Sequence, residues 1–295
     1  MSHTSQEIAS QPVIWQRTLD ALPRHAEALP QRGERVAVIG CGTSLFAGQA
    51  YAALREEAGH GVTDVYPASD CRLGRGYDRV LALTRSGTTT EVLTALGTRP
   101  AASAVTVVTG LAGSPATALA DHAVVLSHAD ERSVVQTRFP TALLILLRAH
   151  LGLPVEQALA DVRTAVAQPL PGAMTAAGQI TFLGSGWTAG LANEAALKVR
   201  EAAGHWTESY SAMEYRHGPI AVAREGRAVW SLSPVEPALA AQVRATGAML
   251  REPRLDPLAE LVLAQRVAVR LAELAGRDPD RPEHLTRSVI LDFTD

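Results

Sequence analysis

The residues best suited to chemistry in this sequence lie in the stretch 194–219. A helical period of 3.6 residues per turn puts Glu194, Lys198 and Glu201 on one stripe of a predicted helix. His217 follows a glycine break, on or near one further turn. A carboxylate and an imidazole beside one cavity can move a proton between carbon atoms and can open a sugar ring.

Spacing alone leaves a simpler interpretation open. The charged stripe is then the solvated face of an amphipathic helix, with a favourable pair between Glu194 and Lys198. The alanine-rich stripe on the opposite side would be the buried one. Amphipathic helices are common, so the charges and their spacing do not by themselves establish a site.

Length and composition bound the fold and exclude several classes of function. A chain of 295 residues can bury a large core and usually forms one or two domains. The net charge is −3 and the cations are scattered, which excludes the charge pattern of a nucleic-acid-binding protein. We expect no membrane span and a cytoplasmic protein, because long apolar runs and a signal-peptide core are missing. Cys41 and Cys71 lack metal-ligand spacing, so no metal and no cofactor are expected.

Short apolar runs alternate with helical patterns along the chain. The runs typical of buried strands are 35–39, 62–66, 79–83, 104–109, 123–126 and 227–232. The helical patterns cover 5–29, 45–58, 90–96, 137–151, 188–203 and 258–275. Strands that alternate with helices predict a parallel sheet with right-handed crossovers.

The second half of the chain repeats the first at an offset of 144 residues. This offset places Gly40 on Gly184 and Glu57 on Glu201. We therefore predict two tandem doubly wound, flavodoxin-like α/β domains with parallel sheets. The predicted parts are an N-terminal helix with the first domain (1–152), the second domain (153–275) and a C-terminal tail (276–295).

Two loops of the first domain combine glycine with hydroxyl groups where a strand gives way to a helix. Their polar residues are Gly42, Thr43 and Ser44 in one loop and Thr84, Arg85, Ser86 and Thr89 in the other. Free N–H groups at a helix start, with hydroxyl donors, make an anion site suited to phosphate, and an arginine can add a charge-assisted contact. The alternative is that the Ser and Thr residues serve as helix caps. A dinucleotide fingerprint would need glycine at Leu45, and no phosphate loop with Gly-Lys-Ser/Thr occurs.

Five motifs, taken in order, resemble those of the sugar isomerase (SIS) family. They are Gly40–Ser44, Thr84–Thr89, Glu131–Thr137, Leu183–Glu201 and Arg216–Pro219. The similarity covers about residues 35–295. It is greatest to the isomerase half of glucosamine-6-phosphate synthase and to the related ketose/aldose-phosphate isomerases, amino-sugar-phosphate deaminases and fructosamine-phosphate deglycases. The resemblance implies two SIS domains and a phosphorylated sugar or amino sugar as the ligand.

The resemblance also implies roles for single residues. The phosphate falls to the first-domain loops, with Gly42, Ser44, Thr84, Arg85, Ser86 and Thr89, and the sugar lies near Thr43, Val134, Gln136 and Arg287. The proton-shuttling glutamate of the family matches Glu201, with Lys198 in support. Its ring-opening histidine matches His217, which in the synthases comes from the neighbouring subunit. A homodimer with composite active sites is therefore implied, with no nucleic acid and no membrane as partner.

Three positions depart from the synthases. Arg85 replaces a glutamine, Gln136 replaces a serine, and Arg287 stands where their tail carries a lysine that reaches the active site. An arginine stays protonated and cannot form an imine. We also expect no N-terminal glutaminase domain, so the ammonia source would be lacking.

These departures favour a phosphosugar aldose/ketose isomerase, or an amino-sugar-phosphate deaminase or deglycase, in which a glutamate moves a proton between C1 and C2. The alternative is a non-catalytic regulator that binds sugar phosphates. Regulators of this kind usually carry a DNA-binding module, and the residues before position 35 are too few for a helix-turn-helix.

Overall fold

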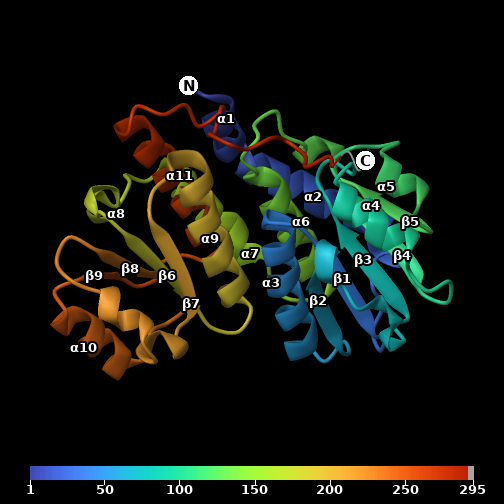
Figure 1. The fold of residues 1–295 in the computed structure, drawn as a ribbon, viewed down its shortest axis with the longest axis horizontal. Coiled ribbons are helices and arrows are strands. Elements are labelled where there is room, and N and C mark those ends of the chain that lie inside the picture. Colours follow the sequence, from blue (N-terminus) through green and yellow to red (C-terminus); the bar gives the residue numbers. More distant parts are fainter. Residues whose placement is uncertain (292–295) are drawn as a thin grey trace. The chain divides into compact units, whose positions relative to one another are not determined.

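The computed structural model describes residues 1–291, and its strands form two parallel sheets (Figure 1). The first sheet has the order β2-β1-β3-β4-β5, with β1 (Val36–Gly40), β2 (Thr63–Pro67), β3 (Arg79–Leu83), β4 (Ala104–Thr109) and β5 (His122–Val125). The second has the order β7-β6-β8-β9, with β6 (Ile180–Gly184), β7 (Thr207–Ser211), β8 (Ala228–Ser231) and β9 (Met249–Arg251).

Both sheets begin with the same pairing. Val36 lies opposite Thr63 in the first sheet, and Ile180 lies opposite Thr207 in the second. Each residue of the second pair lies 144 positions after its counterpart in the first pair. In both sheets the first strand lies between the second and the third, which is the flavodoxin-like order. The predicted fold class, two tandem doubly wound α/β domains, is therefore confirmed.

Helices cover both faces of each sheet (Figure 1). They are α1 (His3–Ala9), α2 (Gln11–His25), α3 (Thr43–Glu57), α4 (Thr90–Gly97), α5 (Pro115–Ala118), α6 (Arg138–His150), α7 (Glu156–Ala167), α8 (Gly172–Ala176), α9 (Thr188–Ala203), α10 (Pro237–Ala245) and α11 (Pro257–Leu274). On the first sheet α3 packs on β1 and β2, and α4 and α5 bury their apolar side chains on the other face. On the second sheet α9 packs on β6 and β7, and α10 covers the opposite face.

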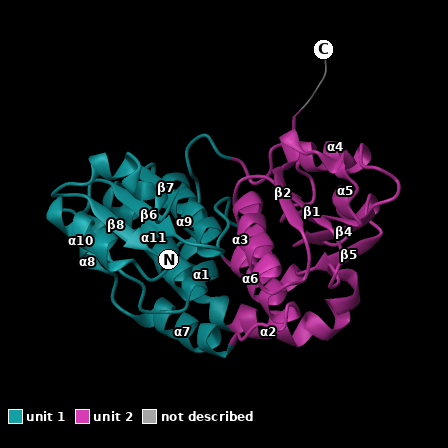
Figure 2. Cartoon of the chain, turned by 90° about the horizontal axis from the view of Figure 1, so that it is seen from below, with its two compact units in different colours: residues 1–12, 132–137, 156–285 teal, residues 13–131, 138–155, 286–295 magenta. Residues whose placement is uncertain are grey.

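The described chain divides into two compact units (Figure 2). Unit 1 contains the second sheet and consists of residues 1–12, 132–137 and 156–285. Unit 2 contains the first sheet and consists of residues 13–131, 138–155 and 286 onward. Residues 1–12 belong to unit 1 because α1 packs against α11 and because Asp280 accepts hydrogen bonds from the backbone of His3 and Thr4, at 2.6 and 2.8 Å.

The N-terminal helical pattern forms two helices instead of the single one predicted over 5–29. The chain breaks at Ser10, between α1 and α2. Pro12 explains the break, because proline lacks the N–H that would bond the carbonyl of Ile8. The sequence patterns also do not predict α7, α10 or β9. Within residues 1–291 no helix combines the length and the apolar character that a membrane span requires.

Candidate active site

The two glycine- and hydroxyl-containing loops lie at the switch point of the first sheet. β1 and β3 are direct neighbours, with Ile39 opposite Ala82. β2 lies beyond β1 and β4 lies beyond β3, so the strand order reverses between them. Folds with this order bind ligands at the carboxyl edge of the sheet at that point. The loops 40–44 and 84–89 therefore lie where a ligand is expected.

Neither helix that follows these loops has a side-chain cap. Gly42 is the N-cap residue of α3, with a φ of 52°, and Thr89 is the N-cap residue of α4. No side-chain capping bond is formed at either position. The interpretation of the hydroxyl groups as helix caps is therefore wrong at these two helix starts. A helix start without a side-chain cap is what an anion site needs.

The second loop has a fixed shape. Its hydroxyl residue Thr84 accepts a hydrogen bond from the Gly87 backbone N–H at 3.2 Å. Gly87 has a φ of 64°, and a Cβ atom there would lie 2.1 Å from the Ser114 hydroxyl oxygen. Only glycine fits this position. The residues at the base of both loops, Thr43, Ser44, Thr84 and Ser86, are buried.

The C-terminal tail lies along this second loop. The Ser288 hydroxyl is 3.1 Å from the Ser86 hydroxyl and 2.9 Å from that of Thr88. The Thr90 backbone N–H donates to the Val289 carbonyl at 3.2 Å. The tail thus contacts Ser86, which the sequence assigns to phosphate, and its neighbour Thr88.

Both arginines that the sequence assigns to the ligand bind groups of the protein. Arg85 is 2% exposed, and one guanidinium nitrogen lies 4.0 Å from Glu131 while another donates to the Arg287 carbonyl at 3.0 Å. Arg287 donates to both carboxylate oxygens of Asp130, at 2.7 and 2.8 Å. Together these bonds join the tail to the loop.

Glu131 connects the start of α6 with Arg85. Its side chain is fully buried and accepts hydrogen bonds from the backbone N–H groups of Arg138 (2.9 Å) and Phe139 (3.3 Å). It therefore caps the start of α6 and faces Arg85 at the same time.

Two of the three residues of the charged stripe of α9, Glu194 and Lys198, are buried. Lys198 lies 3.5 Å from Glu194 and in closer contact with Glu201. The side chains of Lys198 and Glu194 are 1% and 2% exposed, whereas that of Glu201 is 20% exposed. The interpretation of this stripe as a solvated face is therefore wrong. The ammonium group of Lys198 thus lies between two carboxylates, and Glu201 is the one that solvent and a ligand can reach.

A cavity of about 290 Å³ lies beside Glu201. Its lining is formed by Leu197, Arg200, Glu201, Gly204, Arg277, Glu283, His284 and Leu285, all of unit 1. Two carboxylates, two guanidinium groups and an imidazole thus surround one small space. No pattern in the sequence points to His284. The feature that draws attention to His284 is its positive φ of 62°, which only the structure reveals.

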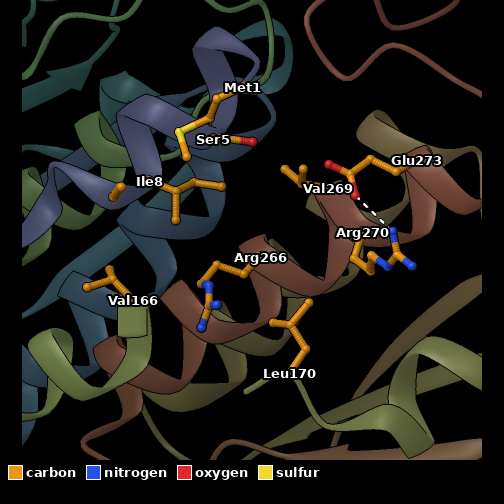
Figure 3. A pocket seen from close by; sticks show the side chains of 10 residues that line it. Met1, Ser5, Ile8, Val166, Leu170, Arg266, Val269, Arg270 and Glu273 are labelled. Atoms are coloured by element: carbon orange, nitrogen blue, oxygen red, sulfur yellow. Dashed lines mark hydrogen bonds and ion pairs between the residues drawn. The ribbon is translucent and has the colours of Figure 1, made fainter. Parts of the chain in front are cut away.

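Another cavity of unit 1 is less suited to catalysis (Figure 3). It has about 240 Å³ and lies between α1, α7 and α11. Most of its lining is apolar. Arg266 donates to the carbonyl groups of Ala165 and Gln168, at 2.6 and 2.7 Å, and Arg270 pairs with Glu273 at 3.1 Å. The guanidinium groups of this cavity are thus engaged with backbone carbonyl groups or with Glu273.

Glu201 lies near the amino ends of the strands of the second sheet, and His217 lies near their carboxyl ends. β6 and β7 are parallel, so α9 runs back along the sheet between them. Glu201 is in the last turn of α9, near the start of β7, whereas exposed His217 follows the end of β7. A helix of 16 residues is roughly 24 Å long. Unit 1 of a single chain therefore does not bring these two side chains together.

The segment 132–137 is held by Glu7, which accepts a hydrogen bond from the Arg132 backbone at 2.6 Å and contacts the Ser133 hydroxyl. Val134 and Gln136 are half-buried. Within residues 1–291 the side-chain oxygen of Gln136 is shielded from solvent and has no hydrogen-bond partner. Such an oxygen is an acceptor suited to a ligand hydroxyl group.

The second sheet differs at the corresponding helix start. α10 follows β8 as α4 follows β3, and its N-cap residue Glu236 accepts hydrogen bonds from the N–H groups of Ala238 and Leu239, at 2.9 and 3.0 Å. These N–H groups, with nearby Arg216, hold the pKa of Glu236 below its ordinary value. A fixed negative charge thus occupies the place where an anion would bind.

Curated relatives of this chain are long sugar-phosphate enzymes. The chain is 27% identical over 308 residues to glutamine–fructose-6-phosphate aminotransferase (isomerizing) of Methanothermobacter thermautotrophicus, covering 88% of this chain and 52% of the relative. It is 29% identical to the enzyme of the same name from Aeropyrum pernix, covering 97% and 57%. The chain therefore spans about half the length of the curated relatives it matches. No protein-family model matches the chain.

Solved structures share the fold over nearly the whole chain. Glucosamine-6-phosphate deaminase from Thermotoga maritima superposes with a TM-score of 0.80 at 22% identity, covering 98% of this chain and 100% of that one. Tagatose-6-phosphate ketose/aldose isomerase from Escherichia coli gives a TM-score of 0.77 at 20% identity, covering 99% and 98%. The chain thus has the fold of these phosphosugar isomerases and deaminases.

Proposed function

We propose that this protein is an enzyme that acts on a phosphorylated sugar or amino sugar, as an aldose/ketose isomerase or as a deaminase or deglycase. The observation that carries the proposal is the ion pair of buried Lys198 with half-buried Glu201, whose carboxylate lines a cavity. The names of the relatives support the substrate class, because they refer to fructose 6-phosphate, glucosamine 6-phosphate and tagatose 6-phosphate.

Glu201 is the proton carrier in this proposal. Its carboxylate takes the proton from C2 of the open-chain aldose, which leaves an enediol, and returns it to C1 to give the ketose. With a nitrogen on C1 or C2, the same step prepares the loss of an amine or ammonia by addition of water. Lys198 positions Glu201 and balances its charge. His217 of a neighbouring subunit assists the opening of the sugar ring.

The phosphate of the substrate is assigned to the loops 40–44 and 84–89. Two helix starts without a side-chain cap and several hydroxyl groups support this assignment. The hydroxyl of Ser288, which contacts Ser86 and Thr88, then gives way to the phosphate oxygens. Gln136 offers its unpaired oxygen to a sugar hydroxyl.

The reaction class is tested by following hydrogen exchange with solvent. The protein is incubated in D₂O with a panel of hexose 6-phosphates and their 2-amino and N-substituted forms, and the products are followed by mass. An enzyme of this class incorporates deuterium at C1 or C2 of at least one compound. Binding of a phosphosugar without any exchange would instead favour a non-catalytic regulator.

The anion site is tested by removing two hydroxyl groups. Replacing Ser86 and Thr89 together with alanine is expected to weaken phosphosugar binding by at least about tenfold, since each lost hydrogen bond to a charged group costs about 1.5–3 kcal/mol. Binding of the unphosphorylated sugar stays unchanged. Titration calorimetry measures both, with Thr98→Ala at the far end of α4 as the control. Equal weakening of both sugars would place the phosphate elsewhere.

We further propose a homodimer with composite sites, in which His217 of one chain completes the Glu201 site of the other. The position of these residues at opposite ends of the strands of one sheet supports this assembly. Inactive Glu201→Gln and His217→Ala chains, unfolded and refolded together, are expected to regain up to about a quarter of the wild-type sites. Half of the randomly paired dimers are mixed, and each has one intact site. Activity that stays at zero, or a monomer by light scattering, would contradict the composite dimer.

A further inference from the structure

We propose that His284 is the second acid–base group of the Glu201 cavity and that it moves the proton between the oxygen atoms on C1 and C2 of the substrate. This inference rests on the proposed function and deepens it. It adds a residue of the same subunit to the site.

The chemistry requires such a group. When Glu201 removes the proton from C2, the electron pair moves toward the carbonyl oxygen on C1, which must gain a proton. When the proton returns to C1, the hydroxyl on C2 must lose its proton to become the carbonyl of the ketose. One group that first donates and then accepts a proton balances both steps, and an imidazole can do this near neutral pH.

His284 is placed for this task. It lines the same cavity of about 290 Å³ as Glu201, and its side chain is exposed to solvent. Its backbone has a φ of 62°, and it is the one residue other than glycine with a positive φ in the part of the chain that the structure describes. This conformation is unfavourable for most residues and collects at functional sites, where the surrounding structure enforces it.

The segment that carries His284 is fixed onto the unit that carries Glu201. Arg277 pairs with Glu283 at 3.0 Å, next to His284 in sequence. The guanidinium of Arg277 lies against Gly204, where an added Cβ would be 2.5 Å from its nitrogen. Upstream in the segment, Asp280 accepts hydrogen bonds from the N-terminal backbone, at 2.6 and 2.8 Å.

The other candidates for this proton are less suitable. Arg200 and Arg277 line the cavity, but a guanidinium group does not release its proton in proteins. Glu283 is paired with Arg277. Lys198 is 1% exposed and contacts two carboxylates, and it is absent from the described cavity lining.

The test replaces His284 with asparagine, which tolerates the left-handed backbone and has no ionisable side chain. We expect kcat for a phosphosugar that the wild type converts to fall by about 100-fold or more, with binding of that sugar within a few-fold of wild type. Deuterium exchange at C2 should fall less than turnover, and the pH dependence of kcat should differ from that of the wild type. The control is His122→Asn, at an exposed histidine of β5 in unit 2.

The outcomes separate this inference from the proposed function. If the wild type converts a phosphosugar and His284→Asn does so at the rate of the His122→Asn control, the inference is wrong while the proposed function stands. If His284→Asn loses turnover and exchange equally, with an unchanged pH profile, a structural role of the tail replaces the proton relay. If the wild type converts no phosphosugar, the proposed function and this inference fall together.

Discussion

Replacing Glu201 with glutamine is expected to lower turnover by about 10²- to 10⁴-fold, the usual contribution of a general acid–base group. Glutamine has the same shape but cannot accept a proton. Lys198 keeps Glu194 as a partner at 3.5 Å, so the fold of α9 should be retained. Binding of the phosphosugar should stay within a few-fold, because the change leaves the loops 40–44 and 84–89, which we propose for the phosphate, unaltered.

Glu57 provides a matched control for this prediction. It occupies the position in α3 that corresponds to Glu201 in α9, and it is exposed. The position that corresponds to Lys198 is Leu54, so α3 carries no such charge pair. Glu57→Gln should leave kcat unchanged. Normal turnover by Glu201→Gln would remove the carboxylate from the mechanism, and equal losses in both variants would indicate a general effect of the charge change.

Replacing Glu131 with alanine is expected to cause the largest loss of stability among the variants considered. The change leaves Arg85, which is 2% exposed, without the carboxylate of Glu131, and it removes the acceptor for the first N–H groups of α6. Removing one partner of a buried ion pair costs about 3–5 kcal/mol. The thermal midpoint of unit 2, followed by circular dichroism, should fall by roughly 10 °C.

The neighbouring residue serves as the comparison. Asp130 pairs with Arg287 at 2.7 Å, and their side chains are 22% and 38% exposed. Exposed ion pairs contribute only about 0–1 kcal/mol, so Asp130→Ala should move the midpoint by little. Similar midpoints for both variants would mean that Arg85 finds another partner when Glu131 is absent.

The strands and the central helices were predictable because their patterns are local. β3, β4 and α9 begin and end where the apolar runs and the helical period place them. The elements that were predicted wrongly or missed depend on tertiary structure or on a single residue. Pro12 divides the N-terminal helix, and the three-residue strand β9 is too short for a pattern.

For the candidate site, the sequence supplies residue types but not their arrangement in space. The sequence indicates that Glu194, Lys198 and Glu201 share a stripe, but burial of that stripe depends on what packs over it. The contact of Ser288 with Ser86 joins residues 202 positions apart, and no local pattern reports such a contact. The same holds for His284, since its conformation is set by the chain around it.

The carboxylate at the start of α10 bears on the stoichiometry of ligand binding. Two copies of one topology could hold two phosphosugars per chain. Glu236 already occupies the N–H groups of Ala238 and Leu239, which an anion at this helix would need. We therefore expect saturation at one phosphosugar per chain.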